Sequence, residues 1–521
     1  MKNRLPIDDL RSWLQCLEEE GHLSKITEQV NWDQELTGVV RRAYDVLGDA
    51  SPAFLFENIE NYEEPGPNKL FIGQFRSYSR LCLMLGLDPA ESTRRDIVTT
   101  LKTMFQNKIE PETVSEGPVH QCIDQGDDID LLKFPVPHFN YRDGGRYIGT
   151  MHAVITKDRD GGWVNLGMYR VMVHSKNEVG IYFKPGRQHI GQHYLKYMEA
   201  GEPMPVAIAI GMDPRLCFIS SGNVPAGVCE YDIAGAMKGE PIQVVQGKAV
   251  DLPVPAHAEI VIEGFVHPTE RREEGPFGEY PGYYGEVPGP SPVMHVTAVT
   301  HREDPIFQAS LEGHPINESH ILSSDMKSAT NWNELEHNGV PGIKDIACIP
   351  ESSNAHIVVS VKPTVPGHAD WISSVIWGNT SAVWLFKHVF VVDDDINPWD
   401  LGQVNWAMAW RVKAGEDIKI WKNHRGSPID PRQEPETKGY WDRMLVDATR
   451  PFDWKPRDIW GSEGVDKGEP QNYPPTSRPA QETIDLVNSK WEKYGIEPVE
   501  NFIGNPVGIM RNWWAEDGGE D

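Results

Sequence analysis

The most constraining feature of the chain is a series of short apolar runs between residues 147 and 300, separated by turn residues. Short runs rich in Val, Ile and aromatic side chains, bounded by Gly, Pro, Asn or Asp, are typical of β-strands. Many such strands in succession favour a β-barrel or a β-sandwich. We expect two helices, near residues 190–200 and 230–238, to interrupt them. The expected strands are 147–157, 163–174, 178–183, 206–211, 216–220, 242–245, 258–266 and 293–300.

The regions on both sides of these strands have the mixed pattern of α/β domains. Near the start, Leu10, Trp13, Leu14 and Leu17 recur at helical spacing, and Gly21 follows where a helix would end. Other expected helices are 77–85, 93–106, 318–328, 371–377 and 399–413, and other expected strands are 53–56, 70–73, 355–361 and 388–392.

The chain therefore divides into an N-terminal α/β domain (1–120), a strand-rich central domain (121–310), a C-terminal α/β domain (311–450) and an extension (451–521). The fold class is α+β. The extension holds one expected helix, 481–494, and ends in an acidic run, 516–521. We expect this extension to contact other subunits of an oligomer.

Charge and hydropathy exclude several classes of protein. The net charge of −28 disfavours nucleic-acid binding, which depends largely on Lys and Arg. The sequence has no run of about 18 apolar residues and no apolar signal segment, so we expect a cytoplasmic protein that does not span a membrane. The six scattered cysteines suit reduced thiols better than disulfides or a zinc cluster. An anionic ligand would need local cations, from Arg, Lys or a metal.

Two carboxylates, Glu274 and Glu279, flank a Gly-Pro-Phe-Gly turn between two expected strands. Proline and glycine make such a turn rigid. Neighbouring carboxylates tend to share a proton, which keeps a general acid available near neutral pH. The alternative is a solvated acidic loop, because Glu270, Glu273 and Glu286 lie close in sequence.

Asn165 and Arg170 lie in one of the expected central strands, 163–174. A buried Arg needs a carboxylate partner. Strict alternation would place the two side chains on opposite faces, so either a bulge near Gly167 brings them together or they serve different parts of a site. The alternative places Arg170 at an exposed rim, paired with any acid.

The segments 184–193 and 220–232 contain Asn, His and Glu side chains, a mixed oxygen and nitrogen donor set that suits Mn²⁺ or Mg²⁺ better than Zn²⁺. Their long separations leave a surface or helix-capping role open, and His193 competes with His189 as a ligand. The sequence contains no G-x-G-x-x-G, no phosphate-binding P-loop and no G-x-S-x-G nucleophile motif.

Taken together in their order, these motifs resemble the UbiD family of reversible, non-oxidative decarboxylases. The resemblance covers most of the chain. It rests on Asp9-Leu10-Arg11-Ser12-Trp13-Leu14 with Glu20-Gly21-His22-Leu23, on 165–170, on 185–189, on Ser220-Ser221, on Glu230, on 274–279, on Val392-Asp393-Asp394-Asp395-Ile396 and on Asp447-Ala448-Thr449.

The resemblance implies a central split β-barrel similar to flavin reductases, which binds prenylated FMN. By resemblance, Asn165, His189 and Glu230 bind a divalent metal, Mn²⁺ or Mg²⁺, that tethers the cofactor phosphate, with K⁺ nearby. Lys387 would lie near that phosphate. The residues that would contact the cofactor are Asn165, Met168, Tyr169, Arg170, His189, Ser220, Ser221, Glu230 and Lys387. Arg170, Glu274 and Glu279 match the catalytic residues, with Glu279 as the acid that protonates carbon after CO₂ leaves.

The function implied is decarboxylation of an aromatic or α,β-unsaturated carboxylic acid. The resemblance also implies a flavin prenyltransferase as the source of cofactor, and a homo-oligomer, dimeric or hexameric. Three alternatives stay open: decarboxylation of an aromatic acyl-CoA thioester, hydride transfer by plain FMN on the same barrel, and a non-catalytic subunit of a carboxylase complex.

Overall fold

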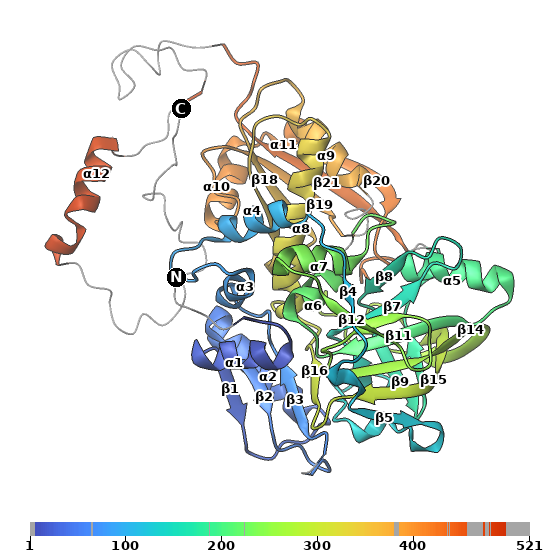
Figure 1. Ribbon diagram of the computed structural model, residues 1–521. Helices are drawn as coiled ribbons and strands as arrows, with labels where there is room; N and C mark the ends of the chain where they lie inside the picture. Colours follow the sequence, from blue (N-terminus) through green and yellow to red (C-terminus); the bar gives the residue numbers. More distant parts are fainter. Residues whose placement is uncertain are drawn as a thin grey trace.

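The computed structural model describes residues 6–63, 66–186, 188–222, 224–379, 385–434, 436, 438–455, 473–474, 479 and 481–495. The fold is α+β, as the sequence predicts: three α/β or β regions follow one another along the chain (Figure 1). Within the described residues, no helix is both long and apolar enough to cross a membrane. The acidic run 516–521 lies outside the described residues.

The N-terminal region packs helices on a small sheet. Asp9 caps helix α1 (Leu10–Glu19): its carboxylate accepts a hydrogen bond from the Ser12 amide at 2.8 Å. The expected apolar face of α1 is buried. The sheet has the order β1-β2-β3-β16, with β1 (Leu23–Ile26), β2 (Ala53–Phe56), β3 (Lys69–Ile72) and β16 (Ile306–Ala309). Strand β16, which falls within the expected central domain 121–310, therefore belongs to the N-terminal sheet. The helices are α2 (Glu35–Leu47), α3 (Tyr78–Leu85) and α4 (Arg94–Met104).

The central sheet is antiparallel throughout and open at one seam. Its order is β6-β9-β10-β15-β14-β11-β7-β8, and β5 pairs with β15. Strands β6 and β8 lie at the two ends of this order and do not pair with each other within the described residues, so the sheet is a split barrel. The strands are β5 (Cys122–Gln125), β6 (Tyr147–Gly149), β7 (His152–Lys157), β8 (Val164–Gly167), β9 (Val171–Ser175), β10 (Glu178–Ile181), β11 (Met204–Ile210), β14 (Ile260–Glu274) and β15 (Gly289–His301).

One expected strand is a helix, and two others, 147–157 and 163–174, are each divided into two strands, β6 and β7 or β8 and β9. Residues 216–220 belong to helix α6 (Pro214–Ser220), which begins after Asp213; the Asp213 carboxylate accepts a hydrogen bond from the Arg215 amide. The helix is buried all round, so its residues are apolar without helical periodicity and resemble a core strand. Helices α5 (His189–Ala200) and α7 (Glu230–Lys238) lie where expected. A separate small sheet contains β4 (Glu112–Thr113), β12 (Gln243–Gln246) and β13 (Pro253–Pro255).

Strands β14 and β15 form a long hairpin that extends beyond the expected segments 258–266 and 293–300. Pairing shifts register between Val266 and Arg271 and then continues to Glu274, which lies opposite Gly289. The residues just before Glu274 are charged, so a search for apolar strand residues does not detect this outer part of the strand. The loop 275–288 closes the hairpin, so Glu274 and Glu279 both lie at its tip.

The C-terminal region is a five-stranded sheet of order β17-β18-β19-β21-β20. Its strands are β17 (Ile343–Ile349), β18 (His356–Val361), β19 (His388–Asp393), β20 (Ile418–Arg425) and β21 (Tyr440–Ala448). Its helices are α9 (His368–Gly378), α10 (Leu401–Arg411) and α11 (Ala414–Asp417), and α12 (Gln481–Ser489) follows in the extension.

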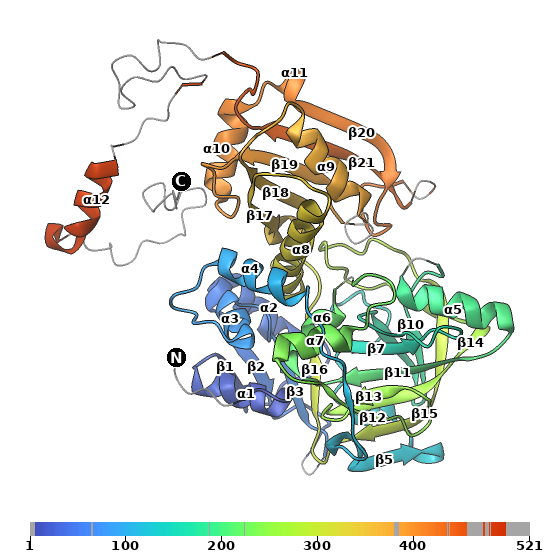
Figure 2. The same ribbon diagram turned by 45° about the horizontal axis from the view of Figure 1, so that its top comes forward.

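Helix α8 (Glu318–His337) lies between this sheet and the rest of the molecule (Figures 1 and 2). Asn317 caps its start, and α4 lies beside it in both views. The Arg94 guanidinium of α4 donates to the buried Asp325 of α8 at 2.8 Å. This ion pair fixes α8 against the N-terminal region.

Candidate active site

A cavity of about 430 Å³ lies where the central sheet, the hairpin tip and α8 meet. Arg170 and Glu279 line it, and so do Tyr182 and Phe277, whose rings lie beside the Arg170 guanidinium. The other lining residues are Gly149, Thr150, His152, Met168, Tyr169, Lys184, Gln188, Ser221, Tyr280, Glu312, Ser319, Leu322, Ser323, Lys327, Leu385, Ser427, Pro428 and Ile429. The cavity thus draws on the central and C-terminal regions together.

Arg170 joins both carboxylates of the hairpin tip. Its Nε donates to Glu274 Oε1 at 2.9 Å and its Nη2 donates to Glu274 Oε2 at 2.7 Å, while Nη1 contacts Glu279. The Arg170 side chain is 9% exposed and the Glu274 side chain 1% exposed. The alternatives of an exposed rim arginine and a solvated acidic loop therefore do not apply to these residues. No bulge is needed, because β8 ends at Gly167 and Arg170 lies in the connection to β9.

The hairpin tip is held from the other side by Asp143. Its Oδ1 accepts a hydrogen bond from the Gly278 amide at 2.8 Å, and its Oδ2 accepts one from the Asn140 amide at 2.9 Å. A side chain at Gly278 would collide with Asn140, since an added Cβ would lie 2.6 Å from Nδ2. At Gly275, φ is +89°, a conformation that favours glycine. These contacts hold the turn in place.

The protonation of Glu279 differs from that of an ordinary glutamate. Burial raises its pKa to about 7, against the lowering effect of Arg170; Glu286, Glu312 and Glu274 raise it further. A carboxylic acid with this pKa exists in both forms near neutral pH and can donate a proton into the cavity.

Three residues around this network do not stand out in the sequence. Tyr147 donates to Glu274 Oε1 at 3.0 Å, and the Tyr182 hydroxyl contacts Glu286. The Tyr182 ring lies 3.9 Å from the Arg170 guanidinium carbon, close enough for a cation–π contact. Tyrosines in strands are usually core residues, so only the structure distinguishes these two; Glu286 is visible in the sequence only as one of several acids.

The candidate metal ligands lie on one side of the barrel. His189 Nδ1 is 3.0 Å from Asn165 Oδ1, and Asn165 Nδ2 is buried without a hydrogen-bond partner among the described residues. Glu230 is 1% exposed, and its Oε2 accepts a hydrogen bond from the Leu166 amide at 2.8 Å. Burial raises the pKa of Glu230 to about 8. A buried amide, a half-buried imidazole and a buried carboxylate fit a divalent cation of the Mn²⁺ or Mg²⁺ type.

His193 lies one turn further along α5. Its Nδ1 is 3.0 Å from the Thr156 hydroxyl, and burial lowers its pKa to about 4. Both imidazoles pack against the Trp163 ring, with centroids 4.8 Å away. Contact with Asn165 distinguishes His189 from His193 and favours His189 as the ligand.

The other residues that were expected to contact the cofactor lie in different places. Met168, Tyr169 and Ser221 line the cavity, whereas Ser220 is buried in α6 and donates to Leu216 O at 2.7 Å. Lys387 is not among the cavity-lining residues; its Nζ lies 2.7 Å from Asp430 Oδ2.

The acidic run that ends β19 stabilises the C-terminal sheet. Arg411 is buried and donates to Asp393 and Asp395, in each case at 2.7 Å. The Arg450 amide also donates to Asp393 Oδ2, at 2.9 Å. These carboxylates are therefore occupied by structural ion pairs.

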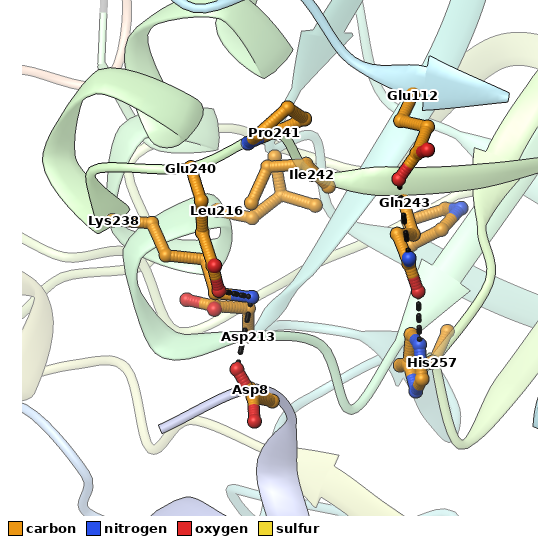
Figure 3. A pocket seen from close by; sticks show the side chains of 12 residues that line it. Asp8, Glu112, Asp213, Leu216, Lys238, Glu240, Pro241, Ile242, Gln243 and His257 are labelled. Atoms are coloured by element: carbon orange, nitrogen blue, oxygen red, sulfur yellow. Dashed lines mark hydrogen bonds and ion pairs between the residues drawn. The ribbon is translucent and has the colours of Figure 1, made fainter. Parts of the chain in front are cut away.

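A second cavity, of about 310 Å³, lies between α1, α7 and the small sheet (Figure 3). Its charged groups pair with one another: Lys238 Nζ is 3.0 Å from Asp8 and 2.8 Å from Glu240. Gln243 bridges Glu112 and His257 in the same view. Because these polar groups satisfy each other, the first cavity is the candidate active site.

Three sequence domains of one family match the chain in order. They are the N-terminal, Rift-related and C-terminal domains of 3-octaprenyl-4-hydroxybenzoate carboxy-lyase (UbiD), at residues 14–98, 112–315 and 320–448. The chain belongs to the UbiD family. UbiD enzymes are carboxy-lyases, so the chain is a decarboxylase.

Named relatives agree with this membership. The pyrrole-2-carboxylic acid decarboxylase of Pseudomonas aeruginosa is 31% identical over 460 residues, 85% of this chain and 91% of that protein. The closed form of the vanillic acid decarboxylase of Sedimentibacter hydroxybenzoicus has a TM-score of 0.82 at 29% identity, covering 93% of this chain and 99% of that one. An evolved dimeric form of the UbiD-class enzyme HmfF of Pelotomaculum thermopropionicum, in complex with prenylated FMN, has a TM-score of 0.73 at 31% identity. The match covers 86% of this chain and 96% of that one.

Proposed function

We propose that this UbiD-family chain is a reversible, non-oxidative decarboxylase of an aromatic or α,β-unsaturated carboxylic acid, and that it uses prenylated FMN. The observation that carries the proposal is the contact of Arg170 with both Glu274 and Glu279 at the wall of the cavity. Two relatives named above are decarboxylases of cyclic acids, and the structure of a third, similar protein is a complex with prenylated FMN.

The roles of the three residues follow from their contacts. Glu274 fixes the plane of the Arg170 guanidinium, whose charge can then orient the substrate carboxylate. Prenylated FMN, when bound, supplies the centre that accepts the electron pair left by CO₂. Glu279, with its pKa near 7, gives the proton that replaces CO₂ on the substrate carbon. The rings of Tyr182 and Phe277 border Arg170 and exclude water from it.

Asn165, His189 and Glu230 would hold a divalent metal, Mn²⁺ or Mg²⁺, beside the cofactor phosphate, with K⁺ nearby. The support is their donor chemistry and the burial of Glu230 without a cation partner among the described residues. Such a metal would supply the positive charge that a phosphate needs in a chain of net charge −28. Met168, Tyr169 and Ser221, which line the cavity, would contact the cofactor.

The size of the cavity favours a small free acid over a CoA thioester. The cavity, of about 430 Å³, is near the lower end for ligand pockets, roughly 300–1,000 Å³, and it must hold part of the cofactor as well as the substrate. A CoA thioester would leave most of its length on the surface of an acidic protein. We also propose that a flavin prenyltransferase supplies the cofactor and that the chain works as a homo-oligomer; a dimeric form of one relative supports the latter.

The test is to produce the chain together with a flavin prenyltransferase and to identify the released flavin by mass spectrometry, with metal analysis of the same sample. Prenylated FMN, about one divalent metal per chain and release of CO₂ from aromatic acids are expected. Preferential uptake of plain FMN, with hydride transfer from a nicotinamide, would contradict the proposal. Purification without any flavin despite co-production would instead favour a non-catalytic subunit.

A further inference from the structure

Lys327 lies on a stripe of α8 that faces the active-site cavity. Ser319, Ser323 and Lys327 follow one another at intervals of four residues, so their side chains lie on one face of the helix, and all three line the cavity with Leu322. This stripe places hydroxyl groups and an ammonium group in the cavity wall. Arg170, by contrast, comes from the β8–β9 connection of the central sheet.

Lys327 has no acidic partner among the described residues, unlike Arg170 and Lys184, the other two cations of the cavity wall. Arg170 pairs with Glu274 and Glu279, and Lys184 Nζ is 3.7 Å from Glu286. Within the described part of the chain, no hydrogen bond or ion pair reaches the Lys327 ammonium group. Burial lowers its pKa, and the thiol of Cys348 is the other ionisable group that affects it.

The acid Glu312, which also lines the cavity, does not neutralise Lys327. Its Oε1 accepts hydrogen bonds from the Ser319 and Ser310 hydroxyls, the latter at 3.3 Å. Burial raises the pKa of Glu312, which favours its neutral form. A desolvated ammonium group without a counter-charge is costly, and an anion bound in the cavity would offset that cost.

Resting on the decarboxylase function proposed above, we propose that Lys327 binds a second anionic oxygen of the substrate, on the part of the molecule away from the departing carboxylate. The chain then selects acids that carry a second carboxylate or an ionisable hydroxyl group. Arg170 holds one end of such a substrate and Lys327 holds the other. Lys327 is thus a specificity-determining residue and takes no part in proton transfer.

The test compares binding of matched acids to the enzyme loaded with prenylated FMN, by isothermal titration. The probes are terephthalate, isophthalate and 4-hydroxybenzoate, each compared with benzoate. Lys327→Met removes the charge and keeps an apolar side chain of similar length. The substitution should weaken binding of each probe that carries a second acidic group roughly 10- to 100-fold, as expected for a lost charge-assisted hydrogen bond. The affinity for benzoate should stay unchanged. Lys327→Arg should restore most of the lost affinity.

Other outcomes overturn the proposal in recognisable ways. An equal loss of benzoate affinity in Lys327→Met would mean that Lys327 binds the departing carboxylate. A loss of flavin content would mean that it binds the cofactor phosphate. Wild-type enzyme that binds benzoate as tightly as every doubly acidic probe would refute this inference alone. Wild-type enzyme that takes up prenylated FMN and neither binds nor decarboxylates any acid would refute the proposed function itself.

Discussion

Arg170 and Glu274 form a two-point ion pair, with Nε to Oε1 at 2.9 Å and Nη2 to Oε2 at 2.7 Å. This geometry fixes the plane of the guanidinium group and directs its remaining nitrogen, Nη1, to Glu279. One carboxylate therefore positions Arg170, while the other has a pKa of about 7 and can change protonation. The two glutamates of one turn thus have different tasks.

Arg170→Lys should lower turnover about 100-fold or more, because an ammonium group cannot form the two parallel hydrogen bonds to Glu274. The measurement is CO₂ release per bound prenylated FMN, which corrects for altered cofactor content. Arg272→Lys is the matched control: Arg272 lies on the same hairpin, is 44% exposed and pairs with Glu270 at 2.9 Å. Equal losses of turnover in both variants would show that activity responds to any change in the hairpin region and does not depend specifically on the two hydrogen bonds from Arg170 to Glu274.

Glu279→Gln should bind cofactor and lose turnover roughly 10²- to 10⁴-fold, the usual contribution of a positioned general acid. Glutamine keeps the size of the side chain and its contact with Arg170 but has no acidic proton. Glu273→Gln is the control, since Glu273 is exposed and lies on the same hairpin. Wild-type turnover of fully loaded Glu279→Gln would rule out Glu279 as the acid.

Glu230→Gln should fold normally and lose the stabilisation that Mn²⁺ gives. The amide oxygen of glutamine can still accept the Leu166 hydrogen bond, so metal-free protein should melt near the wild-type temperature. Without the carboxylate charge, metal and cofactor should bind more weakly, by about 10-fold or more. Thermal unfolding with and without Mn²⁺ measures this difference. An unchanged Mn²⁺-dependent rise in Tm would exclude Glu230 as a ligand.

Much of the fold could be predicted from local patterns. Helix α7 begins and ends at the expected residues, and α5 and α3 do so within one residue, because apolar spacing and capping residues are local. The expected strand at 216–220 is wrong because α6 is buried on all sides and shows no amphipathic period. The return of β16 to the N-terminal sheet depends on a pairing with β3, more than two hundred residues away, which no local pattern indicates.

The candidate site, like the fold, could be predicted from the sequence only in part. The sequence singles out Arg170, Glu274 and Glu279 as a motif, and their contact with one another follows only from the position of the hairpin tip beside the β8–β9 connection. Lys327 carries no sequence signal, because a single lysine on a helix is usually a surface residue. Its importance becomes visible only when burial and the absence of an acidic partner within the described residues are known.

The rate of decarboxylation should fall as the pH rises above about 7, by about tenfold per pH unit, because Glu279 then loses the proton that it must donate. The sign follows from the direction of the shift: burial raises the pKa, so the acid form persists to near neutral pH and disappears above it. The measurement is kcat against pH at saturating substrate. Any residual activity of Glu279→Gln should lack this decrease.

Glu286→Gln tests whether Glu279 is the group that titrates. The negative charge of Glu286 raises the pKa of Glu279, so its removal stabilises the ionised form of Glu279 and lowers that pKa. The alkaline decrease in kcat should therefore move to lower pH in Glu286→Gln. Glu273→Gln should leave the pH profile unchanged, because Glu273 is exposed and solvent screens the effect of its charge on the pKa of Glu279. A decrease that stays at the wild-type pH in Glu286→Gln would assign the titration to another group.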